Sequence, residues 1–174
     1  NTCIAQVIFA YVCKKCFSIR KNALSLELFE PNQESTYMSF QSEKNVVRAY
    51  YAALDSADDA DILGAVEGYI GSEYLWRGYH PFGEITSLAD VVNRFWVPLK
   101  TSITRLQRRQ DVFFAGKNVA PDNNGTWVVS MGHLMGLFDA PWLGIRPTRK
   151  MVFLRYAEFH RVADGKIKET VVYS

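Results

Sequence analysis

The fold of this chain is decided by residues 151–174, MVFLRYAEFHRVADGKIKETVVYS. Apolar and polar residues alternate along both halves of this stretch, and Asp164-Gly165 between them favours a tight hairpin turn. The pattern predicts two long antiparallel strands, Met151–Val162 and Lys166–Tyr173, that are neighbours in a sheet.

The same two-residue period occurs twice more ahead of this hairpin, and three helical stripes precede all of the long strands. The expected strands are Leu106–Ala115 and Thr126–Phe138 with a short strand at 73–78, and the expected helices are 42–54, 58–70 and 88–99. Helices followed by consecutive antiparallel strands are typical of an α+β fold. We therefore expect three N-terminal helices packed on a curved antiparallel sheet.

The third helix carries boundary signals of its own. Ser87 with Asp90 three residues later approximates a capping box, so the helix should begin at this point. Pro98 has no backbone N–H and should kink or end the helix.

Length and charge narrow the class of protein. The chain has 174 residues and a mass of 19.8 kDa, which suits one domain or one domain with a tail. Lys and Arg number 20 against 18 Asp and Glu, a balance that argues against a dedicated nucleic-acid binder. The aromatic content of 14% favours an apolar cavity or a large packed interface.

The beginning of the chain has no sustained period, so we expect an N-terminal extension over residues 1–37 ahead of a domain over residues 38–174. The apolar run Ile4–Val12 is too short to span a bilayer. Cys13 and Cys16 have CxxC spacing but lack the second ligand pair of a structural zinc site. We expect no metal, reduced thiols and a cytoplasmic protein.

Five stretches carry a resemblance to a known family. They are MGH at 131–133, GLF at 136–138, LGIRPTRK at 143–150, RYAEFHR at 155–161 and DGKIKE at 164–169. In this order they resemble the SnoaL-like polyketide cyclases of the nuclear transport factor 2-like (NTF2-like) superfamily, over residues 42–174. The resemblance implies a cone-shaped α+β fold, the NTF2-like or cystatin-like roll. It also implies cofactor-free, aldol-type cyclisation of a polyketide-like compound in an apolar cavity.

The sequence departs from the family pattern at three places. Arg146 stands where the family usually has Pro, and Arg149 stands where it usually has Gly. The catalytic acid of the aldol cyclases would fall directly after Ser174, outside the printed sequence, so that role is not carried over to any residue here.

Three side chains of the hairpin are the candidate catalytic groups. Glu158 and His160 are two residues apart on one strand and therefore share a face, and Glu169 should approach them from the next strand. Burial there should raise the pKa of a carboxyl group, and a neighbouring carboxylate favours a protonated imidazole. This combination suits acid/base chemistry on an enolisable carbonyl compound.

The expected walls of the cavity are large side chains and one further histidine. The candidate substrate-binding residues are His133, Tyr156, Trp76, Trp96, Trp142, Met131 and Tyr50. An apolar pocket with a few convergent polar groups is the usual geometry of a small-molecule site. The expected ligand is therefore a hydrophobic small molecule, bound without a cofactor.

Other interpretations stay open. A non-catalytic binding protein needs only the apolar cavity, whereas a lyase, isomerase or hydrolase reaction on the same fold needs paired acid and base groups. Epoxide hydrolysis needs an Asp-Arg-Asp group, and the inner face offers no obvious set of this kind. The basic cluster Arg105, Arg108 and Arg109 is expected to form a solvated strand face.

Aromatic residues on the face of the sheet opposite the cavity indicate that the protein forms an oligomer. Phe153 and Phe159 should point outward, and exposed aromatic side chains on a sheet usually mark an interface. We expect a homodimer through this face and no nucleic-acid or membrane partner.

Overall fold

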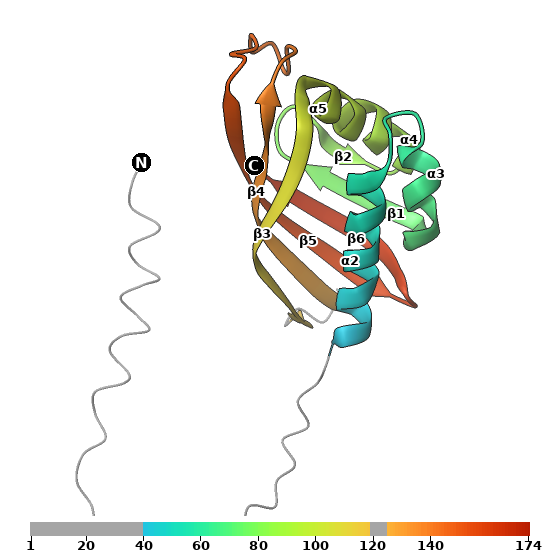
Figure 1. The fold of residues 1–174 in the computed structure, drawn as a ribbon. Coiled ribbons are helices and arrows are strands. Elements are labelled where there is room, and N and C mark those ends of the chain that lie inside the picture. The colour runs from blue at the N-terminus through green and yellow to red at the C-terminus, as the bar shows by residue number, and fades with distance from the viewer. Residues whose placement is uncertain (1–39, 119–124) are drawn as a thin grey trace, which may run out of the picture. The chain divides into compact units, whose positions relative to one another are not determined.

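The computed structural model of the chain describes residues 40–118 and 125–174, so the predicted extension over 1–37 lies outside the described residues (Figure 1). The central element is a six-stranded sheet with the order β2-β1-β6-β5-β4-β3. Its strands are β1 (Ile70–Gly78), β2 (Gly83–Ile85), β3 (Ile103–Lys117), β4 (Thr126–Phe138), β5 (Met151–Ala163) and β6 (Lys166–Tyr173).

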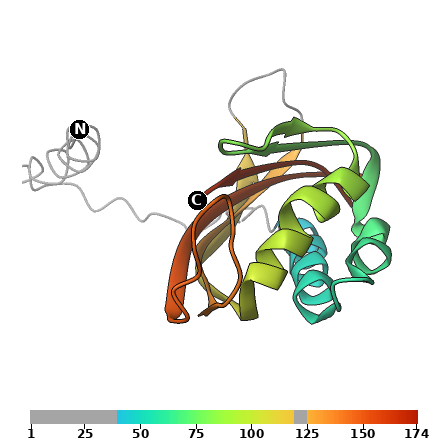
Figure 2. The same cartoon turned by 90° about the horizontal axis from the view of Figure 1, so that it is seen from above.

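The helices lie on one side of the curved sheet, as Figure 2 shows, and we call this side the inner face and the opposite side the outer face. The helical segments are α2 (Gln41–Ser56), α3 (Ile62–Val66), the 3₁₀ turn Glu67–Tyr69, α4 (Leu88–Val91), the π-helical segment Val92–Trp96 and α5 (Val97–Ser102). The α+β composition predicted from the sequence is confirmed.

The predicted hairpin is present, and its turn explains the Asp-Gly signal. Asp164 and Gly165 both have positive φ, +53° and +69°, which is the backbone that a two-residue hairpin turn requires. β3, β4, β5 and β6 pair antiparallel in succession.

The prediction of a wholly antiparallel sheet is wrong. β1 pairs parallel with β6, with Trp76 opposite Thr170, and antiparallel with the short strand β2. The parallel pair joins two segments that lie far apart in the sequence. No local pattern encodes a pairing of this kind, because alternation records the faces of a strand but not its neighbour.

The third helix begins as predicted but does not end at Pro98. Ser87 Oγ accepts a hydrogen bond from Asp90 N at 3.3 Å, the N-cap that the sequence indicates. The chain then makes a π-helical turn over Val92–Trp96 and continues as α5 to Ser102, with Pro98 in the first turn of α5. A π turn changes the local hydrogen-bond spacing, which allows a residue without an N–H to be accommodated.

The core lies between the inner face and the helices. α2 contributes one apolar stripe, formed by the buried residues Val47, Tyr50, Tyr51 and Leu54. Inner-face positions of the strands complete the core, among them Trp76, Val128, Tyr156 and Val172, all 4% exposed or less. No helix among residues 40–118 and 125–174 is long and apolar enough to cross a membrane.

The close approach of β3 to β4 makes a stability prediction at Gly132. A Cβ atom at Gly132 would collide with the backbone carbonyl oxygen of Arg109, next to the β-bulge of β3. We expect Gly132→Ala to lower the free energy of unfolding by about 3 kcal/mol, because backbone rather than a flexible side chain must move. Urea denaturation monitored by tryptophan fluorescence measures the difference.

Gly116 is the matched control on the same strand pair. A Cβ atom at Gly116 meets nothing within 4 Å, so Gly116→Ala should be neutral or stabilising by less than about 1 kcal/mol. Equal losses in both variants would contradict the close approach at Gly132.

Candidate functional site

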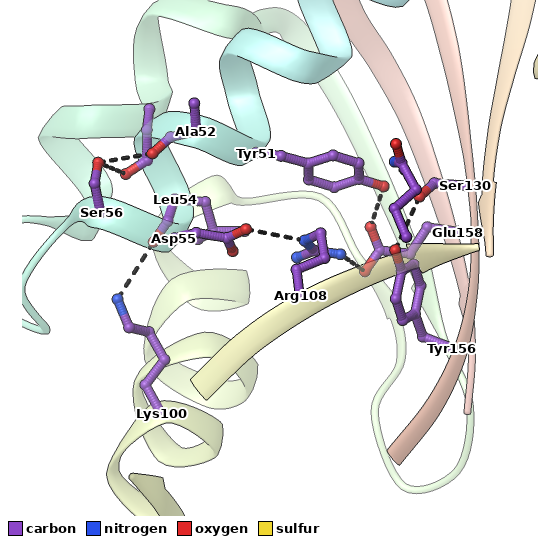
Figure 3. Close-up of polar contacts among 12 residues, drawn as sticks. Tyr51, Ala52, Leu54, Asp55, Ser56, Lys100, Arg108, Ser130, Tyr156 and Glu158 are labelled. Carbon is purple, nitrogen blue, oxygen red and sulfur yellow. Dashed lines mark hydrogen bonds and ion pairs between the residues drawn. The ribbon is translucent and has the colours of Figure 1, made fainter. Parts of the chain in front are cut away.

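Five polar side chains form one connected group in the otherwise apolar core. We call them the Arg108 network: Asp55, Arg108, Glu158, Tyr51 and His160. Two come from α2, one from β3 and two from β5, so the network joins the main helix to the inner face of the sheet. Figure 3 shows Asp55, Arg108, Glu158 and Tyr51 of this network.

Arg108 is the centre of the network. Its Nε donates to Asp55 Oδ2 at 3.2 Å, and its Nη1 donates to Glu158 Oε1 at 3.2 Å. The guanidinium also lies over the ring of Tyr51, with Cζ 4.0 Å from the ring centroid, and near that of Tyr156 at 5.0 Å. Only 5% of the side chain is exposed, so this charge depends on its two carboxylates and on the faces of the rings.

Tyr51 connects Glu158 to His160. The Tyr51 hydroxyl donates to Glu158 Oε2 at 2.5 Å and is 2.8 Å from His160 Nε2. Since the single hydroxyl proton goes to the carboxylate, the imidazole Nε2–H is the donor in the second bond. The other ring nitrogen, Nδ1, is 3.0 Å from the hydroxyl oxygen of Thr170 on β6.

The two carboxyl groups on Arg108 have their pKa values pushed in opposite directions. Burial alone would raise the pKa of Glu158, but the charge of Arg108 and hydrogen bonds from His160 and Tyr51 lower it to about 2. Burial raises the pKa of Asp55, and its ion pair with Arg108 offsets only part of that effect. The expectation that burial would raise the pKa at Glu158 is therefore wrong, because Arg108 was not counted among its neighbours.

The predicted proximity of Glu158 and His160 is confirmed. His160 Nε2 lies 3.4 Å from Glu158 Oε2, and the two side chains are 0% and 1% exposed. Both belong to the inner face, since β5 alternates strictly between buried inner and more exposed outer positions.

The predicted proximity of Glu169 to this pair is wrong. Glu169 lies on the outer face, where its carboxylate pairs with Arg77 at 2.5 Å and Arg161 at 3.3 Å. A β-bulge is the cause: Val162 is opposite Ile167 but Arg161 is opposite Glu169, so β6 contains one extra residue. One extra residue moves every later side chain to the other face.

Two predicted cavity residues of β4, His133 and Met131, also lie on the outer face. His133 Nδ1 is 3.1 Å from Asp111 Oδ2, and Met131 is 39% exposed. The inner-face neighbour of Glu158 on β4 is instead Ser130, which is fully buried. Alternation groups residues correctly into two sets but does not say which set faces the core.

The predicted aromatic residues are split between the core and a separate loop. Tyr50, Trp76, Trp96 and Tyr156 are all buried, and the Tyr50 ring packs edge-on against His160 with centroids 5.8 Å apart. Trp142 belongs to the segment between β4 and β5 and lines a different, apolar cavity of about 180 Å³.

The cavity next to the network is polar and lies at the end of α2. We call it the Asp55 cavity; it has a volume of about 490 Å³ and is lined by Asp55, Ser56, Ala57, Asp58, Asp59, Lys100, Thr104, Arg105 and Leu106. Asp55 is the network member that lines it, with 34% of its side chain exposed. The three other cavities described among residues 40–118 and 125–174 are not lined by Glu158 or His160.

Three members of the network, Tyr51, Asp55 and Arg108, are not among the candidate residues that the sequence predicts. Tyr51 and Asp55 are four residues apart on α2, a spacing that puts them on one helix face and could have paired them. Arg108 was assigned to a solvated strand face together with Arg105 and Arg109. The β-bulges of β3 decide otherwise, because they place Arg108 opposite the buried inner residue Leu134.

Within the described parts of the chain, no three His, Cys, Asp or Glu side chains converge to hold a metal ion. The site as it stands consists of two carboxylates, a guanidinium, a phenol and an imidazole.

No known family model matches the chain, and no curated protein sequence matches it. Solved structures do match, and they share the fold. A candidate SnoaL-like polyketide cyclase from Jannaschia sp. has 19% identity and a TM-score of 0.60, over 81% of this chain and 90% of that one. AclR, a candidate hydroxylase from Streptomyces galilaeus, has 18% identity and a TM-score of 0.60, over 78% and 76%.

A third neighbour is IdmH, a candidate polyketide cyclase from Streptomyces antibioticus, with 15% identity and a TM-score of 0.57, over 76% of this chain and 91% of that one. An NTF2-like protein from Burkholderia thailandensis also matches, at 20% identity and a TM-score of 0.53, over 75% and 88%. The chain therefore has the fold of the NTF2-like and SnoaL-like proteins.

Because Glu158 is ionised when it pairs with Arg108, we expect the free energy of unfolding to fall when acid protonates Glu158. The pKa of Glu158 is about 2 in the folded protein against an ordinary value of 4.5. The ionised carboxylate therefore contributes fully to the free energy of unfolding above pH 4.5, and this contribution is lost as the pH falls through 2. The shift corresponds to about 3 kcal/mol. Glu158→Gln should remove this part of the pH dependence and, at pH 7, cost about 3–5 kcal/mol, because the buried Arg108 then keeps only the partly exposed Asp55 as a carboxylate partner.

Two controls isolate the pair. Glu84→Gln removes an exposed partner of Arg77 and should cost less than about 1 kcal/mol. Combining Arg108→Met with Glu158→Gln should recover stability relative to Glu158→Gln alone, since no buried guanidinium remains and the Asp55 side chain, which loses its partner, is 34% exposed. A Glu158→Gln variant as stable as the parent protein at pH 7 would contradict the assignment.

Proposed function

We propose that this chain is a cofactor-free acid/base enzyme for a small carbonyl compound, and that Asp55 exchanges the proton with the substrate. The observation that carries the proposal is the pair of carboxyl groups held on one guanidinium with opposite pKa shifts, of which Asp55 lines a cavity. Divergent pKa values in neighbouring acids are the usual arrangement of acid/base catalysis.

Asp55 has the properties of the reacting group. Its raised pKa makes its carboxylate a better base and lets it hold a proton closer to neutral pH. Its Oδ2 is fixed by Arg108 Nε at 3.2 Å, which orients the group at the wall of the cavity. As a base it would take a proton from the carbon next to the substrate carbonyl and later return it.

Glu158, Tyr51 and His160 act behind Arg108 in this proposal. Glu158 holds the second edge of the guanidinium, the Tyr51 hydroxyl donates to Glu158, and His160 lies 3.4 Å from the same carboxylate. These residues are positioning groups, because each is 5% exposed or less. The aldol-type cyclisation implied by the family resemblance is one reaction that such a site could perform, and two of the structural neighbours are named as candidate polyketide cyclases.

A second candidate function is epoxide hydrolysis. The series Asp55, Arg108, Glu158 is a carboxylate–guanidinium–carboxylate group, the set for which the sequence offered no obvious candidate. In that reaction a protonated Asp55 would give its proton to the epoxide oxygen as the C–O bond breaks and a water oxygen adds to the epoxide carbon. The Asp55 carboxylate would then take the proton that the added oxygen must lose, which restores its protonated form.

We also propose that the outer face forms a homodimer. Its exposed apolar residues are Val112, Phe114, Met131, Met151, Phe153 and Tyr173, between 39% and 63% exposed. An apolar groove of about 440 Å³ lies on the same face between Phe114, Trp127 and Phe159. A second copy would cover this surface, which is too apolar to suit permanent exposure to water.

The acid/base proposal predicts a loss of activity at Asp55. Exchange of the α-protons of 2-pentanone and 4-oxopentanoate in D₂O can be followed by ¹H NMR without knowledge of the natural substrate. Asp55→Asn should lower the exchange rate at least about 100-fold, because the amide cannot accept the proton. Asp61→Asn, at an exposed carboxylate that does not line the cavity, should retain the parent rate within roughly twofold.

Substitutions at two histidines, one in the core and one on the outer face, show whether His160 reacts with the substrate or only positions Glu158. His160→Gln should reduce the exchange rate without abolishing it, and His133→Gln on the outer face should leave it unchanged. A rate for Asp55→Asn equal to that of the parent protein would overturn the proposal. Abolition of exchange by His160→Gln alone would transfer the reacting role to His160, and binding of ketones without any exchange would favour a non-catalytic binding protein.

The dimer proposal predicts that sedimentation velocity shows a dimer at concentrations on the order of tens of micromolar. Phe114→Ser combined with Phe153→Ser should give a monomer with an unchanged circular dichroism spectrum, because both side chains are exposed on the outer face. Leu63→Ser on α3 is the control for an exposed apolar residue elsewhere and should remain dimeric. A monomeric parent protein would remove the proposal.

A further inference from the structure

We infer that the Asp55 cavity binds a small oxo-carboxylic acid, with the substrate carboxylate held by Arg105 and the carbon next to the oxo group placed at Asp55. The choice of Asp55 as the reacting end rests on the proposed function, whereas the anchoring of the carboxylate does not.

The Asp55 cavity has the size and the polar walls of a site for a small polar molecule. Its volume of about 490 Å³ is in the range of small-molecule sites. Its walls are formed mainly by charged and hydroxyl-bearing residues, with Leu106 and Ala57 as the larger apolar contributions. A small polar molecule fits these walls better than the hydrophobic ligand that the sequence predicts.

Most polar groups of the cavity wall already have partners. Lys100 Nζ donates to the carbonyl oxygens of Leu54 and Ala57. Thr104 Oγ1 is bound to Asp139 at 2.6 Å. Asp59 accepts from Thr101, and Asp55 is paired with Arg108.

Arg105 differs from these groups. Among the described residues it makes no side-chain hydrogen bond or ion pair, and it is exposed. A guanidinium without a protein partner can form two parallel hydrogen bonds to a ligand carboxylate. Arg105 is therefore the lining cation whose whole guanidinium is available to an anion, whereas Lys100 already donates to two carbonyl oxygens.

Arg105 also has an unusual backbone conformation. Its φ is +54°, in the left-handed region that a long side chain seldom adopts, inside the β-bulge between Thr104 and Gln107. Such a conformation persists only where the surroundings impose it, and it is found preferentially at ligand sites. The bulge turns residue 105 out of the strand alternation and makes it part of the cavity wall.

The chemistry of the bound acid is balanced. Asp55 takes a proton from the carbon next to the oxo group, and the electron pair of the C–H bond moves to the carbonyl oxygen as an enolate forms. Return of the proton, or of a deuteron from solvent, regenerates the ketone. The carboxylate stays on Arg105 throughout and fixes which carbon meets Asp55.

The test compares two ligands that differ in the carboxylate. Titration of ¹⁵N-labelled protein with 4-oxopentanoate should shift backbone amides at 55–59 and 100–106, and 2-pentanone should bind at least about tenfold more weakly. Arg105→Gly should weaken 4-oxopentanoate binding at least about tenfold without lowering the melting temperature, because glycine accepts positive φ. Arg109→Ala, on the same strand and paired with Asp111, should bind as the parent protein does.

The outcomes separate this inference from the proposed function. Equal affinity for 4-oxopentanoate in the parent protein and in Arg105→Gly would overturn the anchoring, as would amide shifts confined to the outer-face groove. If exchange occurs equally with 2-pentanone and 4-oxopentanoate and is indifferent to Arg105, the acid/base function stands and this inference fails. If Arg105→Gly loses binding while no ketone exchanges protons, the carboxylate site stands and the acid/base function fails.

Discussion

A buried positive charge is the constraint on which the rest of this structure depends. Arg108 is held in the core by two carboxylates and by the faces of the surrounding aromatic rings. Removing any one partner leaves charge in a low-dielectric environment, so α2, β3 and β5 must keep a fixed relation to one another. The network therefore fixes the helix on the sheet and at the same time orients Asp55 at the cavity wall, where Arg108 offsets part of the rise in the Asp55 pKa that burial causes. Both consequences follow from the same ion pairs.

The strand irregularities decide which groups take part in this arrangement. The bulges of β3 place Arg108 toward the core and Arg105 in the wall of the Asp55 cavity. The bulge of β6 places Glu169 on the outer face, where it pairs with arginines of β1 and β5. A shift of one residue moves all later side chains of a strand to the opposite face. These bulges therefore decide which side chains reach the core and which reach the outer face.

Asp55 lies at the wall of a polar cavity, whereas the family resemblance implies an apolar one. The resemblance to SnoaL-like cyclases points to an apolar interior, and the fold likeness to solved proteins of that kind agrees with the resemblance. The interior around Glu158 and His160 is nevertheless filled by side chains, and the cavity that reaches the network is polar. A shared fold thus fixes where helices and strands lie, while the site is set by a few residues at the end of α2 and the start of β3.

The sequence by itself determined the hairpin of β5 and β6, the α+β class, the N-cap at Ser87 and the shared face of Glu158 and His160. Each of these features depends on residues that are close together in the sequence. Hydrophobic periodicity and turn-forming residues are local signals, so they predict such features. Only the tertiary structure decided that β1 runs parallel to β6, that Glu169, His133 and Met131 face outward, and that Arg108 is buried. These features depend on which distant segment lies alongside and on single-residue bulges. Alternation carries no information on either, because it gives the two faces of a strand without saying which one meets the core.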